Sequence, residues 1–264
     1  MIFDVKPTVV GHRGFGSGTA GGYRENSVES FLAAAASGVS WVELDVRRSG
    51  DGELMIWHDP RSPSGWPITT RTAEQLAAEG IVTLAGVLAS LPAAVGVNID
   101  VKTVIEDATD ADHRRTHAVL ADALRRHRGT RPFLVSSFDP SVPVHLARVG
   151  YGCRGSLGDE VGLGLITSET LAADQCVAAA ANLGLDAACV YTATLQLDRE
   201  EAGQVRGSAA HTIDLAHQAG LEVMTWTATP VQAVRAAAAG IDAVCVDDIP
   251  AVQAALAGAG VRPG

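Results

Sequence analysis

The sequence lacks the features that would assign it to a membrane or nucleic-acid-binding class. No apolar run reaches the roughly 20 residues that a membrane-spanning helix needs. The amino-terminal segment MIFDVKPTVVGHRG contains no hydrophobic stretch of the kind found in signal peptides. Lysine and arginine number 20 against 30 acidic residues, so the formal charge is −10. Because an acidic surface does not attract polyanions, nucleic acid is not an expected partner. The lack of a long apolar run argues against integral membrane association.

Cysteine is scarce and has no metal-binding spacing. The sequence contains no CxxC motif, and its four cysteines lie near apolar residues, at Cys153, Cys176, Cys189 and Cys245. This pattern predicts buried free thiols in a reducing compartment and therefore a cytoplasmic protein. Charged residues amount to 19% and hydrophobic residues to 47%, which favours a well-filled globular interior and argues against disorder.

Short apolar runs alternate with alanine-rich stretches along the 264 residues. Strands are predicted at 8–11, 41–46, 96–102, 133–137, 151–156, 186–190, 221–226 and 243–246. Helices are predicted at 27–37, 72–79, 83–90, 110–128, 140–148, 168–182, 208–219, 230–239 and 250–257. The repeating order predicts a parallel sheet, and eight strand–helix units favour a single (β/α)8 TIM-barrel domain over residues 1–264. An open doubly wound sheet is the alternative.

One segment interrupts this alternation after the second predicted strand. Residues 52–59 (GELMIWHD) are predicted to form an extra hairpin arm, and residues 60–71, with three prolines, an irregular loop. The fold expected from the sequence is therefore a barrel with a short hairpin and loop insertion.

Polar residues gather where the second and third predicted strands end, which is where TIM barrels carry their active sites. Alternate residues of a strand share a face. The residues concerned are Glu43 and Asp45, then Asn98, Asp100 and Lys102. Three carboxylates without nearby cysteine favour a hard cation, Mg²⁺ or Ca²⁺, over Zn²⁺. Alternatively, Glu43 and Asp45 only form ion pairs with basic neighbours, namely Arg47, Arg48 or Lys102.

Two of the eight histidines fall beside this carboxylate cluster. His12 ends the first predicted strand within the motif GHRG, and His58 follows the hairpin arm within WHDP. Histidine is the side chain best suited to proton transfer near neutral pH, so these two are the candidate acid–base pair. The other six fall in predicted helices and receive no role: His113, His117, His127, His145, His211 and His217.

Arg13 and Lys102 supply the local positive charge that an anionic substrate would need on this acidic protein. Arginine can donate two hydrogen bonds to phosphate oxygens, whereas lysine acts as a point charge. Ion pairs with the same carboxylates are the alternative role, and the two roles are compatible.

Taken in order, motifs between residues 8 and 252 resemble those of the glycerophosphodiester phosphodiesterase family. The matching residues are Gly11-His12-Arg13-Gly14, Glu25-Asn26-Ser27, Glu43-Leu44-Asp45-Val46, His58-Asp59, Asn98-Ile99-Asp100-Val101-Lys102, Ser136-Ser137-Phe138, Trp226-Thr227 and the run from Gly240-Ile241-Asp242 to Asp247-Asp248-Ile249-Pro250. No single motif is decisive, but the ordered set is highly specific.

The resemblance implies a TIM barrel that hydrolyses a glycerophosphodiester to sn-glycerol 3-phosphate and an alcohol. It implies one divalent cation, Mg²⁺ or Ca²⁺, and catalysis by a histidine pair. The residues carried over are His12 and His58 for catalysis, Glu43, Asp45 and Asp100 for the metal, Arg13 and Lys102 for the phosphate, Glu25 in support of the arginine, and Trp226 at the pocket wall. The nucleophile is either water or the substrate's own glycerol hydroxyl.

The chain departs from the family pattern at Asp100, where a glutamate is usual. The carboxylate is one methylene shorter, so either the metal lies deeper or a water bridges the gap. The stretch between His58 and Asp100 also lacks the usual pattern, which leaves the head group open.

Two other functions are consistent with these residues. A lysophospholipase D or sphingomyelinase-D-like enzyme would need an apolar groove, for which Phe15, Trp57 and Trp66 are the candidates. A non-catalytic barrel that binds a phosphorylated metabolite would not need both histidines and all the metal acids, and all of them are present.

Overall fold

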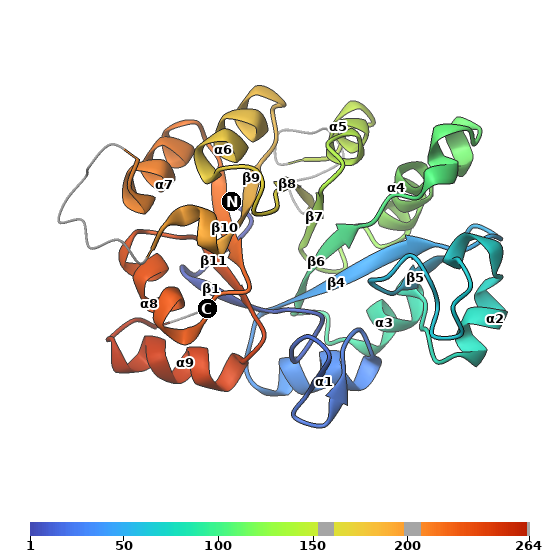
Figure 1. Ribbon diagram of the computed structural model, residues 1–264, viewed down its shortest axis with the longest axis horizontal. Coiled ribbons are helices and arrows are strands. Elements are labelled where there is room, and N and C mark those ends of the chain that lie inside the picture. The colour runs from blue at the N-terminus through green and yellow to red at the C-terminus, as the bar shows by residue number, and fades with distance from the viewer. Residues whose placement is uncertain (153–160, 198–206, 263–264) are drawn as a thin grey trace.

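The computed structural model describes residues 1–152, 161–197 and 207–262, and within these residues eight parallel strands form a closed barrel (Figure 1). The ring closes where β1 pairs with β4, with Val10 opposite Trp41. The eight strands are β1 (Thr8–Gly11), β4 (Trp41–Arg48), β6 (Gly96–Val101), β7 (Phe133–Ser137), β8 (Val161–Ile166), β9 (Ala187–Tyr191), β10 (Glu222–Trp226) and β11 (Ala243–Val246). The predicted TIM barrel is confirmed, and the closing pair rules out the open sheet.

Helices surround the barrel and pack their apolar faces on its outer side (Figure 1). They are α1 (Val28–Ala36), α2 (Ala73–Ala78), α3 (Leu84–Ser90), α4 (Thr116–Arg126), α5 (Ser141–Arg148), α6 (Ala173–Asn182), α7 (Ala209–Gln218), α8 (Pro230–Ala238) and α9 (Ile249–Gly258). Several begin at a residue whose side chain accepts a hydrogen bond from the first turn, among them Ser27, Thr229 and Asp248. None of the helices described is long and apolar enough to cross a membrane.

The predicted insertion after the second barrel strand is present. β5 (Leu54–Ile56) pairs antiparallel with the end of β4, and the loop that follows contains a 3-10 turn at Ile68–Thr70. A second small hairpin, formed by β2 (Thr19–Ala20) and β3 (Tyr23–Arg24), was not expected from the sequence. Its strands are two residues long, too short for a periodicity signal.

The fifth predicted strand was misplaced. Tyr151 and Gly152 are not in a strand, and the rest of the predicted range 151–156 lies outside the described residues. The fifth barrel strand is instead β8, with the sequence VGLGLI. Its two glycines lower the strand signal, and Gly162 leaves space for the Ile2 side chain, which a Cβ at this position would approach within 2.6 Å.

Two predicted helices were too long at their amino-terminal ends. The range 110–128 contains a 3-10 turn at Asp112–Arg114, and the chain is extended at Arg115 before α4 begins. The range 168–182 becomes helical only at Ala173. In both segments the polar residues before the helix form turns, a tendency that helical periodicity alone does not detect.

The inside of the barrel is filled from both ends by apolar side chains, including Ile2 and Phe3 of the amino-terminal segment. Three of the predicted free thiols, those of Cys176, Cys189 and Cys245, are confirmed as buried and unpaired. The fourth cysteine, Cys153, lies outside the described residues.

The end of the barrel opposite the strands' carboxyl ends is held by a buried charge cluster. Lys6 Nζ lies 2.8 Å from Glu222 and 2.5 Å from Asp242, whose side chain is fully buried. Asp242 also accepts hydrogen bonds from His217 and from the Val223 backbone.

Replacing Lys6 by methionine should lower the free energy of unfolding by about 2 kcal/mol, because it leaves buried carboxylates without their cation. Urea unfolding followed by circular dichroism measures this change. Arg125→Met provides a control, because its ion pair with Asp122 is exposed on both sides and should contribute less than about 0.5 kcal/mol. If the uncompensated carboxylate causes the lower free energy of unfolding, adding Asp242→Asn to Lys6→Met should recover part of it. No recovery in the double variant would show that the explanation is wrong.

Candidate active site

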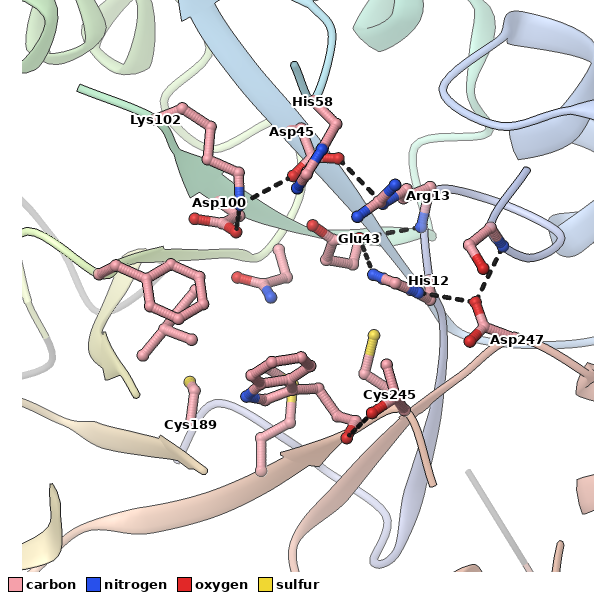
Figure 2. A pocket seen from close by; sticks show the side chains of 17 residues that line it. His12, Arg13, Glu43, Asp45, His58, Asp100, Lys102, Cys189, Cys245 and Asp247 are labelled. Atoms are coloured by element: carbon pink, nitrogen blue, oxygen red, sulfur yellow. Dashed lines mark hydrogen bonds and ion pairs between the residues drawn. The ribbon is translucent and has the colours of Figure 1, made fainter. Parts of the chain in front are cut away.

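A pocket of about 350 Å³ opens at the carboxyl ends of the barrel strands and has two chemically different halves. In Figure 2, charged side chains from β4 and β6 and from the segments that follow β1, β5, β6 and β11 occupy one half, and the thiols of Cys189 and Cys245 lie in the other. The polar half is lined by His12, Arg13, Ser17, Glu43, Asp45, His58, Asn98, Asp100, Lys102 and Asp247. The other half is lined by Phe138, Ile166, Cys189, Met224, Trp226, Thr227 and Cys245.

The carboxylates of Glu43, Asp45 and Asp100 converge in the polar half. One oxygen from each lies within 4.8 Å of the others, and all three residues are buried. Strand register brings them together, because Asp45 of β4 lies opposite Asp100 of β6 and Glu43 is two residues before Asp45 on the same face. The shorter side chain at position 100 therefore still reaches the cluster.

Basic side chains neutralise only part of this charge. Asp45 lies 3.2 Å from Arg13 Nε and 3.1 Å from Lys102 Nζ, and Lys102 also pairs with Asp100. Glu43 has no arginine or lysine side chain as an ion-pair partner among the described residues; it accepts the Arg13 backbone N–H at 2.8 Å. The alternative of simple ion pairing therefore accounts for Asp45 but leaves Glu43 unexplained.

The pKa values express the same imbalance. Burial, together with the charges of Asp45 and Asp100, raises the pKa of Glu43 to about 8. Burial likewise raises the pKa of Asp100 to about 6, although Lys102 opposes the shift. Burial would also raise the pKa of Asp45, but Lys102 and Arg13 outweigh it, so this pKa is lowered.

These residues fit a hard divalent cation. Every donor is a carboxylate oxygen, which Mg²⁺ and Ca²⁺ prefer. Asp100 Oδ1 is buried and has no hydrogen-bond partner in the described chain, so it is free to act as a ligand. A bound cation would also remove the repulsion that raises the pKa of Glu43.

His12 is held in the pocket by Asp247, a residue that strand-end reasoning did not single out. His12 Nδ1 lies 2.7 Å from Asp247 Oδ1, which also accepts the Ser17 backbone N–H at 2.8 Å. Its Nε2 lies 4.0 Å from Glu43. Burial lowers the pKa of His12, but the hydrogen bond to Asp247 and the charge of Glu43 outweigh it and raise the pKa.

Asp247 directly follows β11, so the strand-end rule would have found it if applied to the last strand as it was to the first three.

His58 lies in the same polar half as His12 and is more open to solvent, with 39% of its side chain exposed against 13% for His12. Its Nδ1 lies 2.9 Å from Asp59 Oδ1, and Arg47 Nε donates to its backbone carbonyl at 2.7 Å. Both predicted histidines therefore reach the pocket, and each has a carboxylate beside one ring nitrogen.

The backbone around Arg13 has an unusual conformation. Arg13 and Asn26 have φ angles of 51° and 55°, in the left-handed region that residues other than glycine rarely adopt. The Asn26 N–H donates to the Arg13 carbonyl, and the Asn26 side chain donates to Asp45 at 2.8 Å. Glu25 accepts from the Arg13 guanidinium at 2.9 and 3.1 Å, which is the contact expected of it. Such local strain is typical of functional sites.

Aromatic residues line the wall of the other half. Trp226 lines the pocket as predicted, and its ring packs against Phe138 and Tyr191, with centroids 6.0 and 4.6 Å away. Lys102 Nζ lies 5.1 Å from the Phe138 ring centre.

The three aromatic residues considered for a lipid groove do not line this pocket. Phe15 packs on Tyr23, Trp57 lies beneath Arg24, and Trp66 lies beneath Arg71. None of the other six histidines lines it either. His117 and His145 stack on each other, and His217 bonds Asp242 at the other end of the barrel.

A model of the glycerophosphoryl diester phosphodiesterase family matches residues 12–251 of the chain. Among curated relatives, a glycerophosphocholine phosphodiesterase of Candida albicans is 44% identical over 59 residues, which are 21% of this chain and 5% of that protein. A Mycobacterium tuberculosis protein named probable glycerophosphodiester phosphodiesterase 2 is 36% identical over 101 residues, 34% of this chain and 37% of that protein. The matched segments thus span well under half of either relative.

Solved structures share the fold over nearly the whole chain. An Oleispira antarctica phosphodiesterase, solved in complex with the product sn-glycerol 3-phosphate, aligns with a TM-score of 0.70 and 24% identity, covering 95% of this chain and 97% of that one. A glycerophosphodiester phosphodiesterase from Parabacteroides distasonis aligns with a TM-score of 0.75 and 17% identity, covering 97% and 99%.

Replacing Glu43 by glutamine should stabilise the metal-free protein and abolish its stabilisation by metal. Glutamine can still accept the Arg13 N–H but carries no charge. Because the folded pKa of Glu43 is about 8 and the ordinary value is 4.5, this residue's contribution falls as pH rises between those values. At pH 8.5 in EDTA, the variant should be more stable by about 1–2 kcal/mol.

Thermal unfolding in EDTA and in Mg²⁺ or Ca²⁺ measures both effects, with Glu53→Gln on the exposed surface as the matched control. The explanation by a buried charge at Glu43 is wrong if Glu43→Gln destabilises the metal-free protein. It is also wrong if metal raises the unfolding temperature of the variant as much as that of the wild type.

Proposed function

This chain belongs to the glycerophosphoryl diester phosphodiesterase family, and we propose that it hydrolyses glycerophosphodiesters to sn-glycerol 3-phosphate and an alcohol with one divalent cation. The names of the fungal and mycobacterial relatives and the product bound to the Oleispira antarctica enzyme support this substrate class. The observation that carries the proposal is the cluster of three buried carboxylates beside two cationic side chains and two histidines in one pocket.

Glu43, Asp45 and Asp100 are the proposed metal ligands. A cation held there would stabilise the negative charge that develops on the phosphoryl oxygens. Arg13 and Lys102 are the proposed phosphate-binding residues, because they are the arginine and lysine among the pocket-lining residues. Glu25 and Asp45 hold the Arg13 guanidinium, so its position is set before a substrate arrives.

His12 and His58 are the proposed acid–base pair. One removes a proton from the attacking hydroxyl, and the other protonates the oxygen of the departing alcohol as the phosphorus–oxygen bond breaks. The carboxylate of Asp247 orients the His12 ring through Nδ1 and leaves Nε2 on the side of Glu43. Asp59 is placed to do the same for His58.

A small water-soluble diester fits the pocket better than a lipid. An enzyme acting on lysolipids would need an extended apolar groove, and the three aromatic residues considered for that role lie outside the pocket lining. The aromatic residues that do line it, Phe138 and Trp226, pack edge to face on each other. A non-catalytic phosphate-binding barrel would have no need for two histidines that each have a carboxylate beside Nδ1. Neither alternative is supported by a specific contact.

Hydrolysis of glycerophosphocholine should fall at least about 100-fold in EDTA and return with Mg²⁺ or Ca²⁺. His12→Ala should lower kcat by about 100-fold or more in saturating metal, because proton transfer typically contributes that much. Release of sn-glycerol 3-phosphate, followed by a coupled assay, measures both. His113→Ala, on the exposed surface, should leave the rate unchanged. Activity that survives both chelation and His12→Ala would falsify the mechanism.

Asp247→Asn should lower kcat about 100-fold with little change in KM, because the amide no longer holds the His12 ring as the carboxylate does. The neighbouring Asp248→Asn is a matched control. Asp248 caps α9 through the Ala251 N–H at 3.0 Å, and asparagine caps helices equally well. Steady-state kinetics of the two variants should therefore differ sharply, and equal rates would exclude a positioning role for Asp247.

A further inference from the structure

Asn98 is a buried residue whose side-chain amide donor opens on the pocket and has no acceptor in the described chain. Asn98 lies on β6, is 1% exposed and lines the pocket. Its Oδ1 accepts the Ser136 hydroxyl at 2.8 Å, whereas no described residue accepts a hydrogen bond from Nδ2. An amide this deeply buried normally has its hydrogen bonds satisfied, so the open donor points to a ligand.

The orientation of the amide follows from its neighbours. Glu43 lies opposite Asn98 in the strand register, and Asp100 is two residues further along β6 on the same face. Turning the amide over would place Oδ1 toward these carboxylates and would leave the Ser136 hydroxyl proton without an acceptor in the described chain. The NH₂ group therefore faces the pocket.

The backbone of Asn98 lies deeper in the barrel than that of the proposed phosphate-binding residue on the same strand. Asn98 precedes Asp100 by two residues and Lys102 by four, roughly 7 and 13 Å along the strand, and the Lys102 ammonium reaches back to Asp100 and Asp45. On the opposite wall, Cys189 lies next to Ile166 and Met224 in the strand register. This wall is apolar, and burial holds the pKa of the Cys189 thiol well above its usual value, so the thiol stays neutral.

The deep part of the pocket thus presents the Asn98 amide and the Glu43 carboxylate on one wall and an uncharged wall opposite. A phosphate group bound by Arg13 and Lys102 would lie beside Asp45 and Asp100, which are two residues nearer the mouth in the strand register than Glu43 and Asn98. The part of the substrate that reaches Asn98 must be short, uncharged and able to accept a hydrogen bond. In a glycerophosphodiester, the glycerol group meets all three conditions.

We propose that Asn98 donates a hydrogen bond from Nδ2 to a glycerol hydroxyl oxygen and so makes the site select glycerol esters over esters of simple alcohols. This inference rests on the proposed function, because it takes the phosphate to lie at Arg13 and Lys102. Ser136 acts through Asn98 by holding the amide in place. Selectivity follows because a bound ester without hydroxyls would exclude water from Nδ2 and offer it no acceptor.

Binding of two phosphate monoesters tests the inference without requiring turnover. Calorimetry with sn-glycerol 3-phosphate and with propyl phosphate, which has the same carbon chain but no hydroxyls, should be done in saturating Mg²⁺ or Ca²⁺. The wild type should bind sn-glycerol 3-phosphate at least about tenfold more tightly. Asn98→Leu should reduce this preference to less than about threefold while leaving the affinity for propyl phosphate nearly unchanged.

Two further variants separate the loss of the donor from a folding defect. Asn98→Asp keeps the acceptor for Ser136 but has no donor. It should therefore also lose the preference for sn-glycerol 3-phosphate, even though its charge lowers the affinity for both ligands. Ser136→Ala keeps Asn98 but removes the hydrogen bond that holds its amide in place. This variant should show a preference between those of the wild type and Asn98→Leu. Thermal unfolding establishes that each variant is folded.

The inference is overturned if the wild type shows no preference, if Asn98→Leu keeps it, or if that variant weakens both ligands by the same factor. Hydrolysis of glycerophosphocholine by the wild type separates this outcome from failure of the proposed function. If the wild type hydrolyses glycerophosphocholine and Asn98→Leu still prefers sn-glycerol 3-phosphate, only the role of Asn98 is refuted. An Asn98-dependent preference without hydrolysis of any glycerophosphodiester would refute only the proposed function.

Discussion

Repulsion among the three carboxylates of Glu43, Asp45 and Asp100 is the constraint on which the rest of the site depends. Folding buries them within 4.8 Å of one another, where like charges destabilise each other strongly. Arg13 and Lys102 offset the charge of Asp45, whereas Glu43 has no arginine or lysine partner in the described chain and only His12 at 4.0 Å. Such an arrangement costs stability and is explained by a ligand that makes the cluster favourable when it binds.

The loop after β1 connects this cluster to the proton-transfer groups. The left-handed conformation of Arg13 directs its backbone N–H to Glu43, while its side chain reaches Glu25 and Asp45. Asp247 bonds both His12 and the Ser17 backbone, so the end of β11 holds the same loop from the other side. The carboxylates, the arginine and His12 therefore form one hydrogen-bonded unit, and a change at one of them is expected to affect the others.

Much of the fold could be predicted from the sequence, because strand–helix alternation and strand-end polarity are local signals. The same reasoning brought Glu43, Asp45 and Asp100 to one pocket, because the carboxyl ends of neighbouring parallel strands meet at the same end of a barrel. The strand at 161–166 was missed because Gly162 depends on a contact with Ile2, which is distant in sequence. The open amide of Asn98 could not be predicted for the same reason, because it depends on the rotamer that Ser136 imposes across the strand pair.

The central claim is that one hard divalent cation binds among Glu43, Asp45 and Asp100. Anomalous X-ray diffraction from crystals soaked in Mn²⁺, an oxygen-preferring cation with a measurable anomalous signal, tests it most directly. The account predicts one strong anomalous peak bounded by oxygen atoms of all three carboxylates, and none at this position in crystals of Glu43→Gln. A peak elsewhere, or none in crystals of a protein that hydrolyses glycerophosphodiesters, would contradict it.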